Sequence, residues 1–456
     1  MLLLALPAVV LAHGALKSSS PVRDATLTRL PPNLVLTFTE RVEVGVAKIF
    51  LVRDEADTVA ISALRSDSGG RSIVADIVGA GGSGTYVVHW LVSGKDGHPV
   101  HGTIPFRITG DSGVVDSATT GAQQDSIAAA SPEAYSSEAS PEPTSEIAGG
   151  IYASSGTLHT ATRWLGFAAF FALVGSLMTI VPVASALSRQ GRSSFAQALS
   201  SRACTTALIA VTIFVLADVA RLVLQQRSLA GGGEAVAMGA VLATTWGKAW
   251  LLRIISSAAA AVAIAFIPRT KAVLRRASLL ILMLSAVAIA VGMALSGHAA
   301  AAAAPLLPVF YDALHVLAAS SWTGTLAMVL LVALPRLQSD PATALIALRT
   351  FSAMAVLAVI VLFCTGVLSA WTHLGDFAAL THSVYGKVLL TKLAFVVILV
   401  LLGARNRLRV RSDNVSATDA VRAIGRSGRM EIAFALVVLA ITAVLVSTPT
   451  PPGALH

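Results

Sequence analysis

The sequence predicts a multidomain protein: an N-terminal all-β Greek-key sandwich, a flexible tether, and an all-α polytopic membrane bundle of about eight helices. Composition is the first observation, since 55% of the 456 residues are hydrophobic and only 12% are charged, against about 25% charged in an ordinary soluble domain. The second is that the apolar excess is uneven: residues 13–110 have normal charge density, whereas residues 150–447 carry long apolar runs. A soluble module followed by a membrane module accounts for both.

The first twelve residues have the form of a signal peptide. Residues 2–11 are apolar, and small or aliphatic residues precede a cleavage point after Ala12. The segment is too short to cross a bilayer. Residues 1–12 contain no Lys or Arg, so the basic N-terminal region of a signal peptide is missing. The position of the true start codon is therefore left undecided. Cleavage after Ala12 makes His13 the first residue, with a free α-amine beside its imidazole.

Residues 13–110 alternate in the manner of half-buried strands. Leu34, Leu36 and Phe38 fall on one face of residues 33–40, and residues 84–93 alternate in the same way. Further short strands fit residues 46–53, 72–78 and 102–109, with glycine-rich turns between them. About seven short strands in about a hundred residues predict an immunoglobulin-like sandwich.

Residues 111–150 are predicted to be a disordered linker, because they are rich in Ser, Ala, Pro and Glu and show no apolar periodicity. Residues 151–448 then form the membrane domain, and residues 449–456 a short tail. Apolar runs long enough to span a bilayer are residues 157–187, 203–226, 244–267, 276–297, 306–334, 350–374, 384–404 and 428–447.

Basic residues predict the orientation of these spans. Alternate loops hold nearly all of them, namely Arg189, Arg192, Arg202, Arg269, Lys271, Arg275, Arg276, Arg336, Arg349, Arg405, Arg407, Arg409, Arg411, Arg422, Arg426 and Arg429. The opposite loops between spans hold one, Arg227. We therefore attribute the net charge of +9 to membrane topology, and we expect no nucleic-acid partner. We expect a multi-pass protein of a bacterial plasma membrane, with the sandwich and the C-terminus outside the cytoplasm.

The N-terminal module carries a set of motifs. They are His13, Leu36-Thr-Phe-Thr-Glu40, Tyr86-Val-Val-His-Trp90, Asp96-Gly-His-Pro-Val100 and Gly102. With this pattern the module resembles the CopC copper-binding domain.

The membrane part carries weaker motifs spread over many positions. They are Gly297-His298-Ala299, Asp312-Ala-Leu-His315, Ser321-Trp-Thr-Gly324, Phe351-Ser352, Tyr385-Gly-Lys387 with Lys392, Gly403-Ala-Arg-Asn-Arg407 and Thr448-Pro-Thr-Pro. This part resembles CopD, so the chain looks like a CopC–CopD fusion. The resemblance implies a role in copper transport, homeostasis or resistance, with copper ions, the lipid bilayer and other copper-handling proteins as partners.

The chemistry of the sandwich residues agrees with that implication. Cu(II) prefers a tetragonal set of nitrogen and oxygen donors, which the His13 amine, the His13 ring, His98 and Asp96 can supply. Asp96 and His98 are two residues apart and would project to one side of an extended segment. No Met or Cys lies between His13 and Gly150, so we expect a Cu(II) site without the soft ligands that Cu(I) requires.

The membrane domain offers histidines near its outer side. His315 lies roughly 15 Å into its helix, and Asp312 is one turn earlier on the same face. Polar residues inside a span usually mark a pathway, although interfacial capping and hydrogen bonds between helices are alternative roles. The candidates for a membrane copper path are Met293, His298, Asp312, His315, His159, His373 and His382.

We therefore expect a copper-binding transport protein and not an enzyme: the exported domain captures Cu(II), and the bundle accepts copper and moves it across the membrane. Two alternatives remain. One is a membrane redox protein that uses haem or copper, and the other is a copper sensor or store with an inert anchor. The sequence leaves open import versus resistance, the energy source, the reductant and the oligomeric state.

Overall fold

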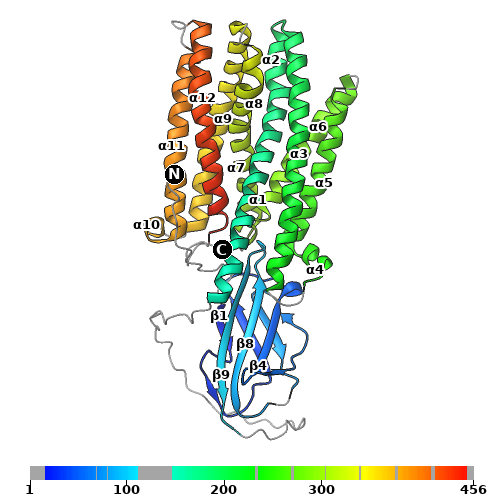
Figure 1. Ribbon diagram of the computed structural model, residues 1–456, viewed down its shortest axis with the longest axis vertical. Coiled ribbons are helices and arrows are strands. Elements are labelled where there is room, and N and C mark those ends of the chain that lie inside the picture. The colour runs from blue at the N-terminus through cyan, green and yellow to red at the C-terminus, as the bar shows by residue number, and fades with distance from the viewer. Residues whose placement is uncertain are drawn as a thin grey trace.

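A computed structural model describes residues 16–67, 69–79, 81–110, 146–231, 235–268, 272–302, 304–337, 340–374, 378–411 and 416–448, without the side chains of residues 146–155 and 373. The N-terminal part is a β-sandwich and the rest is helical, with the sandwich lying against one end of the helix bundle (Figure 1). The predicted fold class is confirmed. The signal peptide, His13 and residues 111–145 of the predicted linker lie outside the described residues.

The strands of the sandwich are β1 (Leu16–Ser20), β2 (Thr26–Leu27), β3 (Asn33–Phe38), β4 (Lys48–Arg53), β5 (Asp57–Val59), β6 (Arg65–Ser66), β7 (Ser72–Asp76), β8 (Gly84–Ser93) and β9 (Pro99–Ile108). They form a four-stranded sheet, β1-β3-β7-β6, and a five-stranded sheet, β2-β9-β8-β4-β5. The strands predicted from alternation are all present, because a period of two in apolar residues fits a strand with one buried face.

The two sheets enclose one apolar core. Leu34, Leu36 and Phe38 of β3 are buried on the inner face. Across the core, the ring of Trp90 on β8 meets Phe38 edge-on with 5.4 Å between centroids. Trp90 also pairs in register with Gly102 on β9, where an added Cβ would lie 2.6 Å from the indole. This packing holds β8 and β9, and thus the turn between them, in a fixed position.

The helical part contains α1 (Glu146–Met178), η2 (Thr179–Val183), α2 (Ala184–Arg189), α3 (Ser193–Ala230), α4 (Met238–Ala243), α5 (Thr245–Phe266), α6 (Ala272–Ala294), η3 (His298–Ala300), α7 (Leu306–Ala319), η4 (Ser320–Gly324), α8 (Thr325–Met328), η5 (Val329–Ala333), η6 (Leu334–Arg336), α9 (Pro341–Leu374), α10 (Ala379–His382), α11 (Val384–Arg411) and α12 (Ala417–Leu445). Eight helical segments of the described chain are long and apolar enough to cross a membrane, which agrees with the predicted number.

Two details differ from the predictions. Helix α1 begins at Glu146, inside the range expected to be linker, and an acidic residue is favourable at the start of a helix. The run 306–334 is one span but not one regular helix, because π-helical turns at η4 and η5 interrupt it. At η4, Gly324 packs closely against Gly175 of α1, where an added Cβ would lie 3.2 Å from the Gly175 Cα. Small residues allow such close approach of helices in membranes.

Local capping explains where several helices begin. The Thr244 hydroxyl accepts the Gly247 N–H at the start of α5, and the Ser416 hydroxyl accepts the Asp419 N–H at the start of α12. The Asp340 carboxylate accepts the Thr343 N–H in the first turn of α9, at 3.0 Å. Each side chain satisfies an amide that has no partner within its own helix.

Candidate functional site

The turn between β8 and β9 carries Asp96 and His98, two of the predicted sandwich ligands, and lies at the end of the sandwich nearest the bundle (Figure 1). The Gly94 N–H donates to the His98 carbonyl at 3.1 Å, and the Gly97 N–H donates to the Gly94 carbonyl at 3.0 Å. Gly97 has φ +88°, in the left-handed region that favours glycine. Asp96 and His98 are therefore presented by a tight turn and not by the extended segment that their spacing suggested.

Asp96 and His98 are joined directly. The Oδ2 atom of Asp96 lies 2.7 Å from Nδ1 of His98, and Oδ1 accepts the backbone N–H of His98 at 3.1 Å. The Asp96 side chain is buried, whereas that of His98 is 25% exposed. A carboxylate bound to one ring nitrogen fixes the orientation of a histidine and makes the other nitrogen the one suited to a metal. The geometry thus supports metal ligation through Nε2 of His98, with Asp96 as its orienting partner.

His298 brings the membrane domain to the same carboxylate. It begins the short helix η3 between α6 and α7, and its Nδ1 lies 3.7 Å from Oδ2 of Asp96. The rings of His98 and His298 stack with 6.0 Å between centroids and an interplanar angle of 25°. The ring of Tyr385 on α11 meets His298 with a centroid distance of 6.4 Å. One carboxylate of the sandwich therefore lies between histidines of two separate domains.

Close packing holds the turn against the bundle. An added Cβ on Gly97 would lie 2.6 Å from Cδ1 of Trp246, at the start of α5. The side-chain amide of Gln225 on α3 donates to the Gly97 carbonyl. Any side chain larger than hydrogen at position 97 would meet the indole ring, so this glycine is required both by its φ and by its neighbour.

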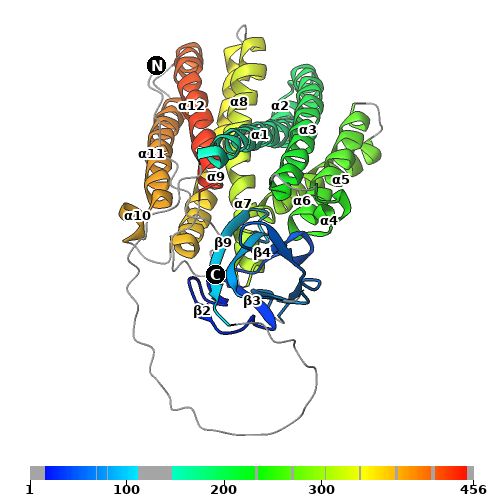
Figure 2. The same cartoon turned by 60° about the horizontal axis from the view of Figure 1, so that its bottom comes forward.

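Other contacts widen the interface around this turn. The Thr245 N–H donates to Glu43 Oε1 at 3.0 Å, and Nζ of Lys48 donates to the Ala230 carbonyl at 3.1 Å. Val46 is buried in an apolar cluster with helix residues that include Leu229. Figure 2 shows the same arrangement with the sandwich toward the viewer, at the α4 and α7 end of the bundle. None of these contacts was predicted from the sequence.

Glu40 adds a second buried carboxyl group near the turn. A Cβ on Gly94 would lie 2.8 Å from Asp96 Oδ1 and 3.9 Å from Glu40 Oε2, so both acids border that glycine. The pKa of Glu40 is raised to about 7, chiefly by burial and also by the negative charge of Asp96, while Arg71 opposes the shift. The sequence showed Glu40 at the end of an alternating strand but gave no sign of its burial.

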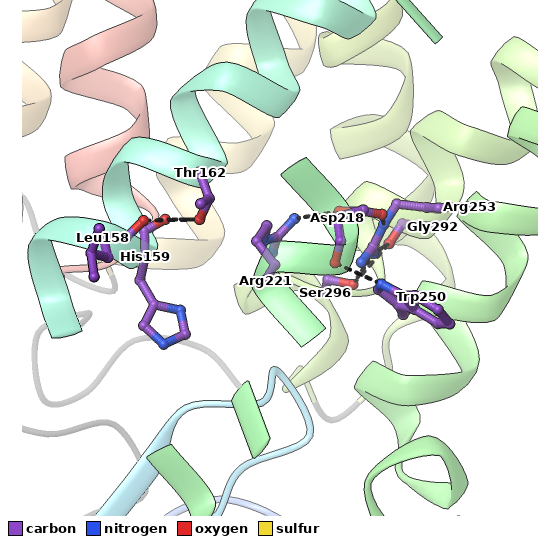
Figure 3. A network of polar contacts seen from close by, with 9 residues as sticks. All are labelled: Leu158, His159, Thr162, Asp218, Arg221, Trp250, Arg253, Gly292 and Ser296. Carbon is purple, nitrogen blue, oxygen red and sulfur yellow. Dashed lines mark hydrogen bonds and ion pairs between the residues drawn. The ribbon is translucent and has the colours of Figure 1, made fainter. Parts of the chain in front are cut away.

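His159 on α1 is half-buried, and Figure 3 shows its ring directed toward the pale-blue segment of the sandwich. The same view contains a polar network in which Asp218 pairs with Arg253 at 2.6 Å and with Arg221 at 3.3 Å. Arg253 is fully buried and also donates to the Gly292 carbonyl at 2.7 Å. This network has two positive charges for one negative charge.

A small cavity borders the network. It is lined by Arg163, Gly166, Phe167, Phe214, Arg221, Met293, Ser296 and Val446. Met293, a predicted path residue, thus lies beside two guanidinium groups. Such a setting repels a cation, so this side of the bundle is unfavourable for copper.

His315 is half-buried between α7 and α9, with Nδ1 2.9 Å from the Thr365 hydroxyl. That hydroxyl has one proton, which it donates to the Val361 carbonyl at 2.7 Å. With the hydroxyl proton on that carbonyl, His315 donates through Nδ1–H, and this tautomer leaves the lone pair on Nε2 available to a metal. Asp312 accepts a hydrogen bond from Ser369 at 3.4 Å, so Thr365 and not Asp312 orients His315.

The remaining candidates do not join these groups. His382 is exposed in α10, and His13 and the His373 side chain lie outside the described residues. Within the described part of the chain, no group of three or more His, Cys, Asp or Glu side chains has the spacing of a metal site. Among the described residues, the Asp96 carboxylate lies 2.7 Å from His98 Nδ1 and 3.7 Å from His298 Nδ1.

Glu431 is a buried acid that sequence reasoning missed. It lies in α12 and is 2% exposed. The side-chain amide of Asn406 donates to its carboxylate, and no Lys, Arg or His nitrogen of the described residues lies within ion-pair distance of it. A Cβ on Gly403 would lie 3.6 Å from Trp322 and 3.8 Å from Glu431. The sequence could have indicated this residue, because Glu431 is the one acidic residue in the apolar run 428–447.

Three family models match this chain: the CopC domain over residues 16–109, the copper resistance protein D-like N-terminal domain over residues 154–307, and copper resistance protein D over residues 345–445. The chain joins a CopC domain to a CopD membrane domain. The CopC match covers the sandwich with the Asp96 turn, and the CopD matches cover most of the helices. A multi-pass membrane protein of the copper resistance and transport family accounts for both.

Several individual proteins are similar to this chain. The copper transport protein CutJ of Bacillus subtilis (strain 168) is 26% identical over 464 residues, covering 99% of this chain and 77% of CutJ. Copper resistance protein C of Xanthomonas campestris pv. juglandis is 34% identical over 104 residues, covering 21% of this chain and 80% of that protein. The crystal structure of PcoC, a methionine-rich copper resistance protein from Escherichia coli, is 27% identical and covers 22% of this chain and 100% of PcoC, with a TM-score of 0.20.

Proposed function

We propose that the CopC domain captures Cu(II) outside the cytoplasm and passes copper directly to the CopD bundle, which moves it across the membrane. The observation that carries this proposal is the position of the Asp96 carboxylate, 2.7 Å from His98 Nδ1 and 3.7 Å from His298 Nδ1. The ring of His98 is then 6.0 Å, centroid to centroid, from the ring of a histidine that belongs to the membrane domain.

Capture would use nitrogen donors, which suit Cu(II). These are the α-amine and ring of His13 after signal-peptide cleavage and Nε2 of His98. Asp96 is hydrogen-bonded to Nδ1 on the opposite edge of the His98 ring, so it would orient that ring and offset part of the copper charge. Because the CopC domain has no Met or Cys, we propose that it holds Cu(II) and not Cu(I), which requires soft ligands.

Transfer would proceed by ligand exchange within the interface. His298 is buried under the docked turn, with a side-chain exposure of 7%, so copper that leaves His98 toward it need not enter bulk water. An exchange between neighbouring imidazoles avoids the full desolvation of a free ion, which is the largest obstacle to moving a charge into a membrane.

The route beyond His298 is proposed to follow α7, α9, α11 and α12. His315 presents Nε2 on this side, held by Thr365. Deeper in the bundle, Glu431 offers a negative or proton-accepting group beside Trp322 and Gly403. The other side of the bundle carries Arg163, Arg221 and Arg253 against one acid, Asp218. Near His315, Lys392 is matched by Asp312, so the balance of charge there is less unfavourable for a cation.

The orientation follows from charge. Loops rich in arginine connect the helix ends opposite the sandwich, and such loops remain in the cytoplasm. We therefore propose that the sandwich, His298 and the C-terminus lie outside the plasma membrane, and that transport is inward. The names of the relatives describe copper transport and copper resistance, and we propose transport rather than catalysis for this chain.

The test is copper flux into sealed vesicles that contain the purified protein, with and without residues 13–110. The proposal expects uptake from low Cu(II) concentrations only when the CopC domain is present. Equal uptake by both proteins would show that the docked domain does not deliver copper. No uptake by either would favour a sensor or store with an inert membrane anchor.

A further inference from the structure

A second site lies at the opposite end of the bundle from the CopC domain. Between α9 and α11 is a cavity of about 350 Å³, lined by Arg349, Ser352, Ala353, Arg407, Val410 and Arg411. These residues occupy the start of α9 and the end of α11, which point away from the sandwich (Figure 1). The copper route described above does not use this cavity.

The cavity is strongly basic. Its six lining residues include three arginines and no acid. Arg407 donates through Nη1 to the Ser352 carbonyl and hydroxyl, at 2.8 and 2.9 Å, and Arg349 donates through Nε to the Val410 carbonyl at 3.3 Å. These bonds fix two guanidinium groups in place before any ligand arrives.

Most of the side-chain donors in the cavity have no partner among the described residues. Within that part of the chain, no hydrogen bond involves Nη1 or Nη2 of Arg349, Nε or Nη2 of Arg407, or any side-chain nitrogen of Arg411. The end of a helix carries a partial negative charge of roughly half a unit, which offsets only part of three full positive charges. Basic residues are expected at this end of the bundle on topology alone, but topology does not require arginines of two helices to meet at one cavity.

We propose that this cavity binds the phosphate group of an anionic phospholipid. Guanidinium groups bind phosphate oxygens through paired hydrogen bonds, and basic pockets between membrane helices on the cytoplasmic side suit lipid head groups. A free phosphate ion shares this chemistry, but the surroundings favour a lipid.

Exposed apolar side chains continue from the cavity toward the middle of the bundle. Arg349, Ala353, Leu357 and Ile360 are spaced by three or four residues and share one face of α9, with Leu357 66% and Ile360 55% exposed. Leu401 on α11 is 64% exposed. An acyl chain can lie along these side chains while its head group occupies the cavity, an arrangement that a free ion does not need.

The experiment uses the purified full-length protein in detergent and measures bound lipid by native mass spectrometry. Phosphatidylglycerol, phosphatidylcholine and inorganic phosphate are titrated in separate arms. The test variant carries Arg349→Gln and Arg411→Gln. The matched control carries Arg405→Gln and Arg422→Gln, which remove the same charge at the same end of the bundle from exposed positions outside the cavity.

We expect the test variant to bind phosphatidylglycerol roughly tenfold or more weakly, and the control to change by less than about threefold. Phosphatidylcholine should bind weakly to all three proteins. An equal loss in the control, or equal binding of phosphatidylcholine, would overturn the proposal. Competition by millimolar inorganic phosphate as strong as that by the lipid would assign the cavity to a soluble anion instead. Thermal unfolding in phosphatidylcholine, measured for each variant, ensures that a loss of binding is not a loss of fold.

Discussion

Replacing Gly97 by Ala should separate the two domains while leaving each of them folded. Two effects act at this position. The φ of +88° makes any residue other than glycine unfavourable by about 1–2 kcal/mol, and this strain is present whether or not the domains are docked. The new Cβ would also lie 2.6 Å from Cδ1 of Trp246, and such overpacking costs about 1–3 kcal/mol.

Only the second effect acts on docking. The isolated CopC domain with Gly97→Ala should lose about 1–2 kcal/mol of unfolding free energy. In the full chain, docking should weaken by a further 1–3 kcal/mol, or roughly five- to 150-fold in its equilibrium constant. Gly70→Ala is the matched control, because Gly70 also has a positive φ, +69°, and an added Cβ there comes no closer than 3.8 Å to another residue.

Docking can be measured as the distance between nitroxide labels placed at Asp57→Cys in β5 and Leu306→Cys at the start of α7, after Cys204 and Cys364 are replaced by Ala. Gly97→Ala should broaden the distance distribution, and Gly70→Ala should not. In a Trp246→Ala background, Gly97→Ala should have no further effect on the distance. A sharp, unchanged distribution for Gly97→Ala would refute the interface as the structure shows it.

Three further predictions follow from single side chains. Because the pKa of Glu40 is raised to about 7 by burial, the unfolded copper-free CopC domain loses this proton at a lower pH than the folded one. Stability should therefore fall by up to about 3 kcal/mol as the pH rises from about 4.5 through 7, and Glu40→Gln should remove most of this fall in urea unfolding; an unchanged slope would contradict the assignment. One extra residue before His13 should weaken Cu(II) binding by the CopC domain by roughly ten- to a hundredfold, as measured by chelator competition, and equal affinity would exclude the α-amine as a ligand. His315→Ala should abolish copper uptake without changing expression or Cu(II) binding by the CopC domain, while Thr365→Val, which removes the partner of Nδ1, should reduce uptake only in part. Normal uptake by His315→Ala would make this histidine a structural hydrogen-bond donor.

Local patterns predicted the fold well. Alternation around Leu34, Leu36 and Phe38 located β3, because one face of that strand is buried and burial repeats every two residues. The eight apolar runs located the spans because their length alone is diagnostic. The π-helical turns of the fifth span left no such signature, and neither did the close approach of Gly324 to Gly175 in another helix.

The site was predictable only within each domain. The residue types of the Asp96 to Pro99 segment indicated a metal site, but the conformation of the segment was predicted wrongly. The Asp-Gly pair favours a turn, so Asp96 and His98 do not lie on one side of an extended strand. His98 and His298 are two hundred positions apart in the sequence, and no periodic pattern of residues predicts that they lie close together. The same is true of Arg253 on α5, which pairs with Asp218 on α3.

The central claim, that copper passes from the CopC domain to the bundle at His298, is tested most directly by the initial rate of copper uptake into vesicles that contain His298→Ala. His382→Ala is the control, since His382 is exposed on the same side of the membrane domain. The account predicts that His298→Ala loses most of the uptake while its CopC domain still binds Cu(II) as tightly as the unchanged protein, and that His382→Ala takes up copper normally. Normal uptake by His298→Ala would contradict the account.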